Sequence, residues 1–296
     1  KTVIAAASIG DSNAFGSGGV TPPGGQIVNS KVFCYASATG QVPYSESNLG
    51  FRTLDPNGTG RLPEYLSYIE DVYPDNRGFI GQYLGGNGNA AMQMASTVQQ
   101  GTGEEPDVYL YQCAAGGTTA DNWANGLNWD TLERTIPAAL AAIPGSPTYF
   151  DIIYISLGTN DCNQDYTAEQ FYTNMKTLRD KMIVEGWWVP NTTRIALMDL
   201  PRNGSVTGAA GDYPDTWDGI NYVLARFNDR ISMINSIGME YEPIFPVHYL
   251  PPSYTSMGLR TGELLLADIP KQQAVFTIGG VRLSLGGQKL RVNSNA

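Results

Sequence analysis

The residue best suited to chemistry in this sequence is Ser12, which closes the motif Gly10-Asp11-Ser12. The motif directly follows the apolar residues 3–7, a pattern typical of a buried strand that ends in a tight turn. Such a turn raises one side chain above the carboxyl edge of a parallel sheet, where open α/β folds place their sites. A serine hydroxyl in that position favours nucleophilic attack on an acyl carbon, although Gly-Asp-Ser also suits an ordinary turn.

Two further predicted strands end in residues that suit acyl transfer. Residues 107–113 lead to Gly117, and residues 151–157 lead to Asn160. Because parallel strands end at a common edge, we expect both residues to meet Ser12 there. The backbone N–H groups of Ser12 and Gly117 and the Asn160 side-chain amide would then form an oxyanion hole. Each motif alone also fits a turn or a helix cap, so the prediction depends on their combination.

These motifs resemble the first three sequence blocks of the SGNH (GDSL) hydrolase superfamily: Gly10-Asp11-Ser12, Gly117 and residues 158–161. Residues 115–123 further resemble a segment of sialate O-acetylesterase-like members, many of which act on acetylated carbohydrates, with relatives in bacteriophage tails. The resemblance implies a three-layer α/β/α fold, Ser12 as the nucleophile, and the oxyanion donors named above. It also implies that neighbouring residues contact the substrate, namely Asp11, Gly116 and Asp161.

The family's last block, Asp-x-x-His, is altered in the segment that resembles it. In residues 279–284, Gly279 stands in place of the aspartate and Arg282 in place of the histidine. Glycine has no side chain and a guanidinium stays protonated, so neither can serve as the general base. His248, the only histidine, lies near the end of a predicted strand and is a candidate base for Ser12, although a purely structural histidine fits there too. Arg282 is predicted to bind a polar or anionic group of a sugar.

Two functions therefore stay open at this point. The first is an esterase that removes acetyl groups from a carbohydrate through Ser12, with His248 or another group as the base. The second is a catalytically silent descendant, either a glycan-binding protein or a structural protein of a virion such as a phage tail. We expect a carbohydrate partner, an extracellular or virion-associated location, and self-association or assembly into a virion. Hydrolysis that depends on Ser12 separates the two functions.

Composition excludes several other classes of function. The chain has 296 residues, a net charge of −10 and only 16% charged residues. The negative charge disfavours nucleic acids and anionic membranes as partners, and no apolar run reaches the roughly 18 residues that span a bilayer. Three cysteines do not make a disulfide framework, and a single histidine gives no support for a metal site. Because no nucleotide-binding motif is present either, we expect no cofactor.

The elements that position these residues alternate between strands and helices, which predicts a parallel sheet covered on both faces. We expect a single domain over residues 1–296, built as a three-layer α/β/α sandwich with a five-stranded parallel sheet. Residues 17–88 are rich in Gly, Pro and aromatic residues and are predicted to form a long irregular insertion over the Ser12 edge. The fourth and fifth strands are predicted at residues 194–200 and 240–248.

Helices are predicted where apolar side chains recur every three or four residues. The clearest spans residues 168–185, where Thr167 and Gln170 have the spacing of a capping box. The same periodicity predicts further helices over residues 89–101, 132–140 and 217–234, and a short last helix within residues 276–292.

Overall fold

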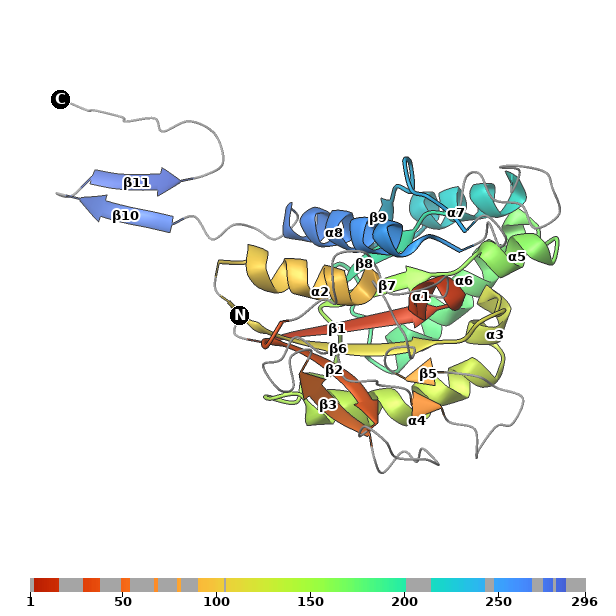
Figure 1. Ribbon diagram of the computed structural model, residues 1–296, viewed down its shortest axis with the longest axis horizontal. Helices are drawn as coiled ribbons and strands as arrows, with labels where there is room; N and C mark the ends of the chain where they lie inside the picture. Colours follow the sequence, from red (N-terminus) through yellow and green to blue (C-terminus); the bar gives the residue numbers. More distant parts are fainter. Residues whose placement is uncertain are drawn as a thin grey trace.

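The computed structural model describes residues 3–15, 29–37, 49–53, 67–68, 79–80, 90–103, 105–200, 214–242, 248–267, 274–278 and 281–285. Within these residues the chain builds three layers, with helices on both faces of a central sheet (Figure 1). The predicted α/β/α class is therefore confirmed. None of the helices in the described ranges is long and apolar enough to cross a bilayer.

Within the described part of the chain, the central sheet has nine strands, most of which follow the order β3-β2-β6-β1-β7-β8-β9. Five neighbours, β6-β1-β7-β8-β9, run parallel, and β2 adds a sixth parallel strand beside β6, one more than the five predicted. The edge strand β3 is antiparallel to β2. The strands of this sheet span β1 Val3–Gly10, β2 Val32–Ser37, β3 Leu49–Thr53, β4 Ser67–Tyr68, β5 Phe79–Ile80, β6 Asp107–Ala114, β7 Ile152–Ser156, β8 Arg194–Met198 and β9 Arg230–Ile234.

The strand order determines where a site can form. The chain leaves β1, builds β6 on one side of it, and then passes back to build β7 on the other side. The direction of winding therefore reverses between β1 and β7, and open α/β sheets bind their ligands at the carboxyl ends of the strands that meet at such a reversal. The two strands of this pair are the ones that lead to Ser12 and Asn160.

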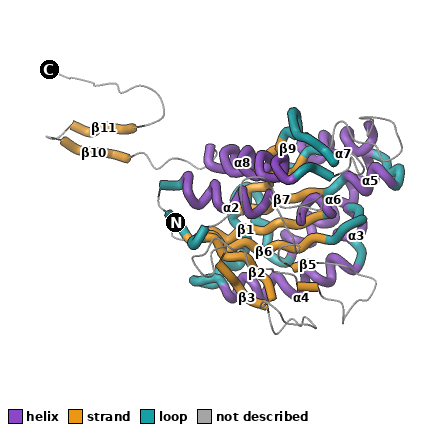
Figure 2. Tube along the Cα trace, in the orientation of Figure 1, coloured by secondary structure: helices purple, strands orange, loops and turns teal. Residues whose placement is uncertain are grey.

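Helices cover both faces of the sheet (Figure 2). One face carries α2 and α8, which pack against each other, and the other face carries α3, α4, α6 and α7. Two short helices, α1 and α5, directly follow β1 and β7. The helices span α1 Ser12–Phe15, α2 Ala90–Gly101, α3 Ala120–Ala124, α4 Leu127–Ala142, α5 Thr159–Asn163, α6 Ala168–Val184, α7 Pro214–Arg226 and α8 Pro251–Ala267.

The central strand β1 shows why its sequence is an unbroken apolar run. Ile4 and Ala6 pack in the core on the α2–α8 face, whereas Ala5, Ala7 and Ile9 pack in the core on the opposite face. A strand that is buried on both faces needs apolar side chains at consecutive positions, and not at alternate ones. This double burial confirms that β1 is the middle strand of the sandwich.

The predicted helix over residues 217–234 is wrong in its second half. α7 ends at Arg226, and Arg230–Ile234 form β9 instead. Apolar residues at 231 and 234 fit a helical repeat, but a short segment of this kind fits a strand equally well. The parallel pairing with β8 makes the segment a strand. Consequently β9 is the fifth parallel strand, and the prediction of that strand at residues 240–248 is also wrong.

The end of the chain differs from the prediction as well. No helix forms in the described part of residues 276–292, because Ala274–Ile278 (β10) pairs antiparallel with Val281–Leu285 (β11) in a second, two-stranded sheet, and residues 286–292, where the predicted helix would have to lie, are outside the described residues. The last helix among the described residues is α8, which the sequence analysis missed because it begins at Pro251 and Pro252. Proline interrupts a helix interior but is favoured in the first turn, so these two residues start the helix.

The insertion predicted as irregular over residues 17–88 is partly regular. It supplies β2, β3, β4 and β5 to the central sheet. β5 lies antiparallel to the last residues of β6, with Phe79 opposite Ala114 and Ile80 opposite Cys113. The described part of the insertion therefore reaches the carboxyl edge of the sheet on the β6 side, which is the edge where it was expected.

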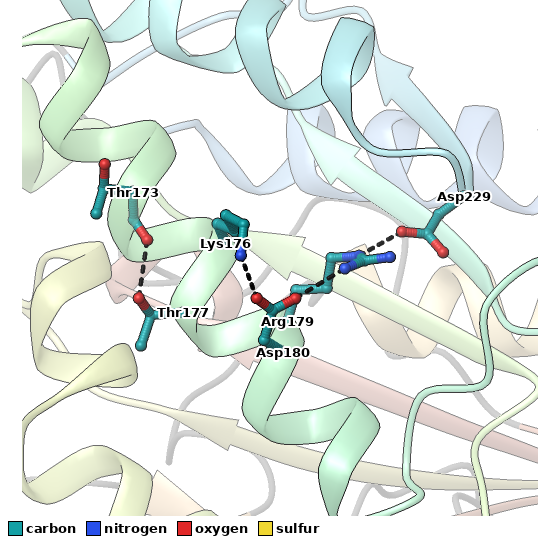
Figure 3. A network of polar contacts seen from close by, with 6 residues as sticks. All are labelled: Thr173, Lys176, Thr177, Arg179, Asp180 and Asp229. Atoms are coloured by element: carbon teal, nitrogen blue, oxygen red, sulfur yellow. Dashed lines mark hydrogen bonds and ion pairs between the residues drawn. The ribbon is translucent and has the colours of Figure 1, made fainter.

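The capping box predicted for α6 is confirmed, and further along the same helix a polar network joins α6 to β9 (Figure 3). Arg179 Nε donates a hydrogen bond to Asp229 Oδ2 at 2.5 Å, and Arg179 Nη1 pairs with Asp180 at 2.8 Å. The side chain of Asp229 has 0% exposed surface. Lys176 also pairs with Asp180, but on the solvent side of the helix.

Replacing Arg179 by methionine is expected to lower the free energy of unfolding by about 3 kcal/mol, because Asp229 would keep a buried charge without its partner. The matched variant Lys176→Met removes an exposed ion pair and should cost less than about 1 kcal/mol. Urea unfolding of both variants measures the difference. Equal losses in the two variants would show that the Asp229 contact adds nothing beyond a surface pair.

Candidate active site

Ser12 is held at the carboxyl end of β1 by a turn that fits closely against β7. A Cβ atom at Gly10 would lie 2.1 Å from the backbone oxygen of Ser156, so only glycine fits at this position. The next residue, Asp11, donates its N–H to that same oxygen at 2.9 Å. Ser12 then begins α1 and is only 8% exposed. The motif Gly10-Asp11-Ser12 is therefore a rigid strand-to-helix turn.

Side chains beneath this turn tie it to three neighbouring elements. Asp11 Oδ1 accepts hydrogen bonds from Asn13 N–H at 2.9 Å and from Ser156 Oγ at 3.3 Å. Asn13 Oδ1 accepts from the Tyr254 hydroxyl of α8 at 2.8 Å, and Asn13 Nδ2 donates to Thr159 Oγ1 of α5 at 3.4 Å. The position of Ser12 is thus fixed by contacts to β7, α5 and α8.

His248 reaches Ser12 from the segment that precedes α8. Its Nε2 lies 2.9 Å from Ser12 Oγ. On the other side of the ring, Nδ1 lies 3.7 Å from Glu242 Oε2. With its proton on Nδ1, the imidazole accepts a hydrogen bond from the serine and points its N–H towards the carboxylate. A serine next to a histidine, which in turn lies next to a carboxylate, is the arrangement found in catalytic triads.

Backbone pairing holds the histidine and the carboxylate together. Glu242 N–H donates to His248 O at 2.9 Å, and the neighbouring residues Tyr241 and Tyr249 form an antiparallel bridge. The Tyr249 hydroxyl donates to the backbone oxygen of Asp199, directly after β8, at 3.1 Å. This pairing anchors the His248 and Glu242 side chains at the carboxyl edge of the sheet.

Burial lowers the pKa of His248 below its ordinary value of 6.5, and Glu242 offsets part of that effect. Burial acts in this direction because a charged imidazolium loses its hydration inside the protein. The ring is therefore neutral at neutral pH, which is the state that can accept a proton from a serine hydroxyl.

The loops after β6 and β7 flank Ser12 on both sides. The three strands end at the same level of the sheet, because their last residues are paired in register: Gly10, Ala114 and Ser156. Gly117 lies in the β6 loop with a φ of +75°, a conformation that favours glycine. Asn160 lies in α5, and its side-chain Nδ2 is buried without a hydrogen-bond partner among the described residues. A buried donor is costly unless something supplies an acceptor, so this amide is suited to a ligand oxygen.

Two carboxyls predicted to contact substrate are instead fully buried, since Asp11 and Asp161 are both 0% exposed. Burial is the main cause that raises the pKa of each to about 7. Asp161 accepts the Ala120 N–H at 3.0 and 3.1 Å and so joins the β6 loop to the β7 loop. Both side chains hold the loops in place, and substrate contact by them stays a prediction. Gly116, predicted for the same role, is exposed.

Two further residues singled out in the sequence belong to the end of the chain. Arg282 belongs to β11, where it is opposite Thr277 in the two-stranded sheet, and Gly279 lies outside the described residues. Their roles stay predictions. The carboxylate Glu242 was missed, although its position in the same segment as the only histidine was the available signal. Among the residues that the structure describes, no group of three or more His, Cys, Asp or Glu is placed to hold a metal ion.

No protein-family model matches the chain, and no curated protein matches it in sequence. Solved structures match it in fold. The X-ray structure of a protein from Arabidopsis thaliana matches with a TM-score of 0.57 and 15% identity, over 90% of this chain and 98% of that one. A carbohydrate acetylesterase from Sinorhizobium meliloti matches with a TM-score of 0.48 and 13% identity, over 89% of this chain and 99% of that one. A GDSL-like lipase from Parabacteroides merdae has a TM-score of 0.49 and 12% identity, over 88% and 96% of the two chains. The chain thus shares the fold of the Arabidopsis protein over 90% of its length.

Proposed function

We propose that this chain is an SGNH-type ester hydrolase that removes acetyl groups from the hydroxyls of a carbohydrate, with Ser12 as the nucleophile. The observation that carries the proposal is the 2.9 Å contact between Ser12 Oγ and His248 Nε2. A buried serine beside a neutral histidine, itself beside a carboxylate, is the arrangement that turns a hydroxyl into a nucleophile. The sequence resemblance to acetylesterases supports the acetyl group and the sugar.

In the proposed reaction Ser12 Oγ attacks the ester carbonyl carbon while its proton passes to His248 Nε2. The imidazolium that forms is stabilised by Glu242 and then gives the proton to the departing sugar oxygen. Water, deprotonated by the same histidine, attacks the acyl-serine in the second half of the reaction, releasing acetate and restoring the Ser12 hydroxyl. Glu242 and His248 thus take the parts of the family's Asp-x-x-His block, and no group at positions 279 and 282 is needed.

The carbonyl oxygen becomes negative in both halves of this reaction, and three donors are proposed to stabilise it. They are the backbone N–H groups of Ser12 and Gly117 and the side-chain amide of Asn160. The buried Nδ2 of Asn160, which has no acceptor within the described part of the chain, supports this assignment. Donors that are fixed before the reaction contribute most, because they need no reorganisation when the charge develops.

The proposed base predicts how hydrolysis depends on pH. His248 must be neutral to accept the proton, so activity should be lost as the pH falls through its pKa. Because burial lowers that pKa, the midpoint of the acidic limb of kcat/KM should lie below 6.5. The Glu242 carboxylate raises the pKa, so the limb of Glu242→Gln should lie at still lower pH. Profiles for p-nitrophenyl acetate measure both, and a wild-type midpoint above 6.5 would contradict the assignment.

Covalent labelling tests the proposed nucleophile directly. The full chain is treated with diethyl p-nitrophenyl phosphate, and the modified peptide is identified by mass spectrometry. The phosphoryl group should be found on Ser12, and His248→Ala should remove the labelling because the hydroxyl then lacks its base. A chain that is not labelled, and that releases no more acetate from acetylated xylan than Ser12→Ala does, would instead favour the silent glycan-binding or virion function.

A further inference from the structure

A concave, open-sided site lies between α3 and α6. It is a cavity of about 520 Å³, a volume within the range of small-molecule binding sites. Polar side chains and one aromatic ring line it, among them Asp121 of α3, Tyr166 in the loop before α6, and Gln170 and Asn174 of α6. The triad proposed above uses none of these residues. We refer to this site as the α3–α6 cavity.

The α3–α6 cavity adjoins the loop that carries Asn160. Asp161, the next residue, accepts the N–H of Ala120 at the start of α3 through its carboxylate. The backbone oxygen of Asp161 accepts the N–H of Tyr166 at 2.9 Å. One residue therefore connects both walls of the cavity to the proposed oxyanion donor. Because α3 follows β6 and α5 and α6 follow β7, the cavity lies at the edge of the sheet where Ser12 is found (Figure 1).

Hydrogen bonds within the protein hold two of the polar walls in place. Asp121 Oδ1 accepts a hydrogen bond from Asn125 Nδ2 at 2.8 Å. Gln170 Oε1 accepts from the Thr167 N–H at 2.9 Å, as part of the α6 capping box, which leaves the amide NH₂ group as a donor. Side chains that are ordered in advance lose little entropy when a ligand binds. The cavity is therefore prepared to receive hydrogen-bonding groups.

The lining also indicates the chemical class of ligand. Carboxylate and amide side chains together accept from and donate to hydroxyl groups, and the ring of Tyr166 offers a face for C–H groups. Two carboxylates, Asp121 and Glu169, disfavour an anion, as does the net charge of −10. Every lining side chain carries a polar group, but apolar atoms make up much of the exposed surface of the cavity. A neutral sugar unit, with hydroxyls on its rim and C–H groups on its faces, combines the features that the cavity can recognise.

We propose that the α3–α6 cavity binds a neutral sugar unit of an oligosaccharide and is a carbohydrate subsite for the ester substrate. Its part in substrate recognition rests on the proposed function, whereas the binding of the sugar does not. An acetylated oligosaccharide would place one acetyl group at Ser12 and a neighbouring sugar ring against Tyr166. The cavity would then contribute to KM for such a substrate and not to that of a small acetyl ester.

Calorimetric titration of the full chain carrying Ser12→Ala tests the binding without turnover. The probes are xylohexaose, cellohexaose and chitohexaose. At least one of them should bind, and Tyr166→Ala in the same background should raise its Kd by about tenfold, the equivalent of one good aromatic contact. Asn174→Ala, a smaller change at the same wall, should also raise it. The matched control is Tyr222→Ala, since Tyr222 is an exposed tyrosine of α7 outside the cavity.

Kinetics in the active background complete the test. Tyr166→Ala should raise KM for acetylated xylo-oligosaccharides about tenfold and leave kcat/KM for p-nitrophenyl acetate unchanged. If no oligosaccharide binds, or if Tyr166→Ala and Asn174→Ala leave binding unchanged, the subsite is overturned. Sugar binding that depends on Tyr166, in a chain without Ser12-dependent hydrolysis, would support the sugar site and overturn the proposed function alone.

Discussion

Ser12→Ala is expected to lower kcat for acetyl-ester hydrolysis by about 10⁶, leaving only what the oxyanion donors and substrate binding supply. The substitution removes one buried oxygen that is 2.9 Å from His248 Nε2, and it leaves the contacts of Asp11 and Asn13 that shape the turn. The loss should therefore appear in kcat and not in the melting temperature. Release of acetate from acetylated xylan, followed beside thermal unfolding, measures both quantities.

The same experiment can show that serine and histidine act as one unit. His248→Ala should cost about as much as Ser12→Ala, and the double variant should be no slower than either, because neither group works without the other. Ser256→Ala is the matched serine control and should keep full activity, because the Ser256 hydroxyl donates to the backbone oxygen of Pro252 within α8. If Ser12→Ala kept more than about a tenth of the activity, another group would have to be the nucleophile.

Glu242→Gln is expected to lower kcat by about 10³ to 10⁴, with KM little changed. The amide has nearly the shape of the carboxylate but carries no charge, so it cannot stabilise the imidazolium. An amide that turns its NH₂ group towards the ring also favours the tautomer with its proton on Nε2, which cannot accept from Ser12. The 3.7 Å separation between Nδ1 and Oε2 places the expected loss below that of removing the histidine itself.

Glu240→Gln is the matched control for this prediction. Glu240 belongs to the same segment and carries the same charge, but its side chain is exposed. Its replacement should leave kcat within about twofold, as expected for a solvated carboxylate that gains little from any partner. If the two substitutions lowered p-nitrophenyl acetate hydrolysis equally, Glu242 would act only through its negative charge and not through its position beside His248.

The nucleophile and the predicted oxyanion residues could be found from the sequence because each directly follows a strand. A buried strand can be recognised by its run of apolar residues, and the end of the strand fixes the position of the residue that follows. Ser12, Gly117 and Asn160 all belong to this class, and the paired ends of β1, β6 and β7 bring their loops to one edge. For these three residues, the local sequence pattern is therefore enough to predict the tertiary position.

His248 was named as a candidate base from a predicted strand end at 240–248 that the structure does not form, and its carboxylate Glu242 could not be found at all, because the relation between the two is tertiary. Glu242 and His248 are brought together by a hydrogen bond between their backbones, and five residues separate them in the chain. A search for Asp-x-x-His, with its two intervening residues, passes over them and finds the similar residues 279–284 instead. The same cause explains why residues 230–234 were predicted as helix, since only the partner strand β8 decides their conformation.

The two buried carboxyls beside the nucleophile have a consequence for how the chain folds. Asp11 and Asp161 ionise at about 7 in the folded protein and at about 3.8 when exposed, so between these values folding takes up protons. The contribution of both groups to stability is therefore fully present in acid and is lost as the pH rises through about 7. For these two groups, mildly acidic surroundings favour the native chain over its unfolded form.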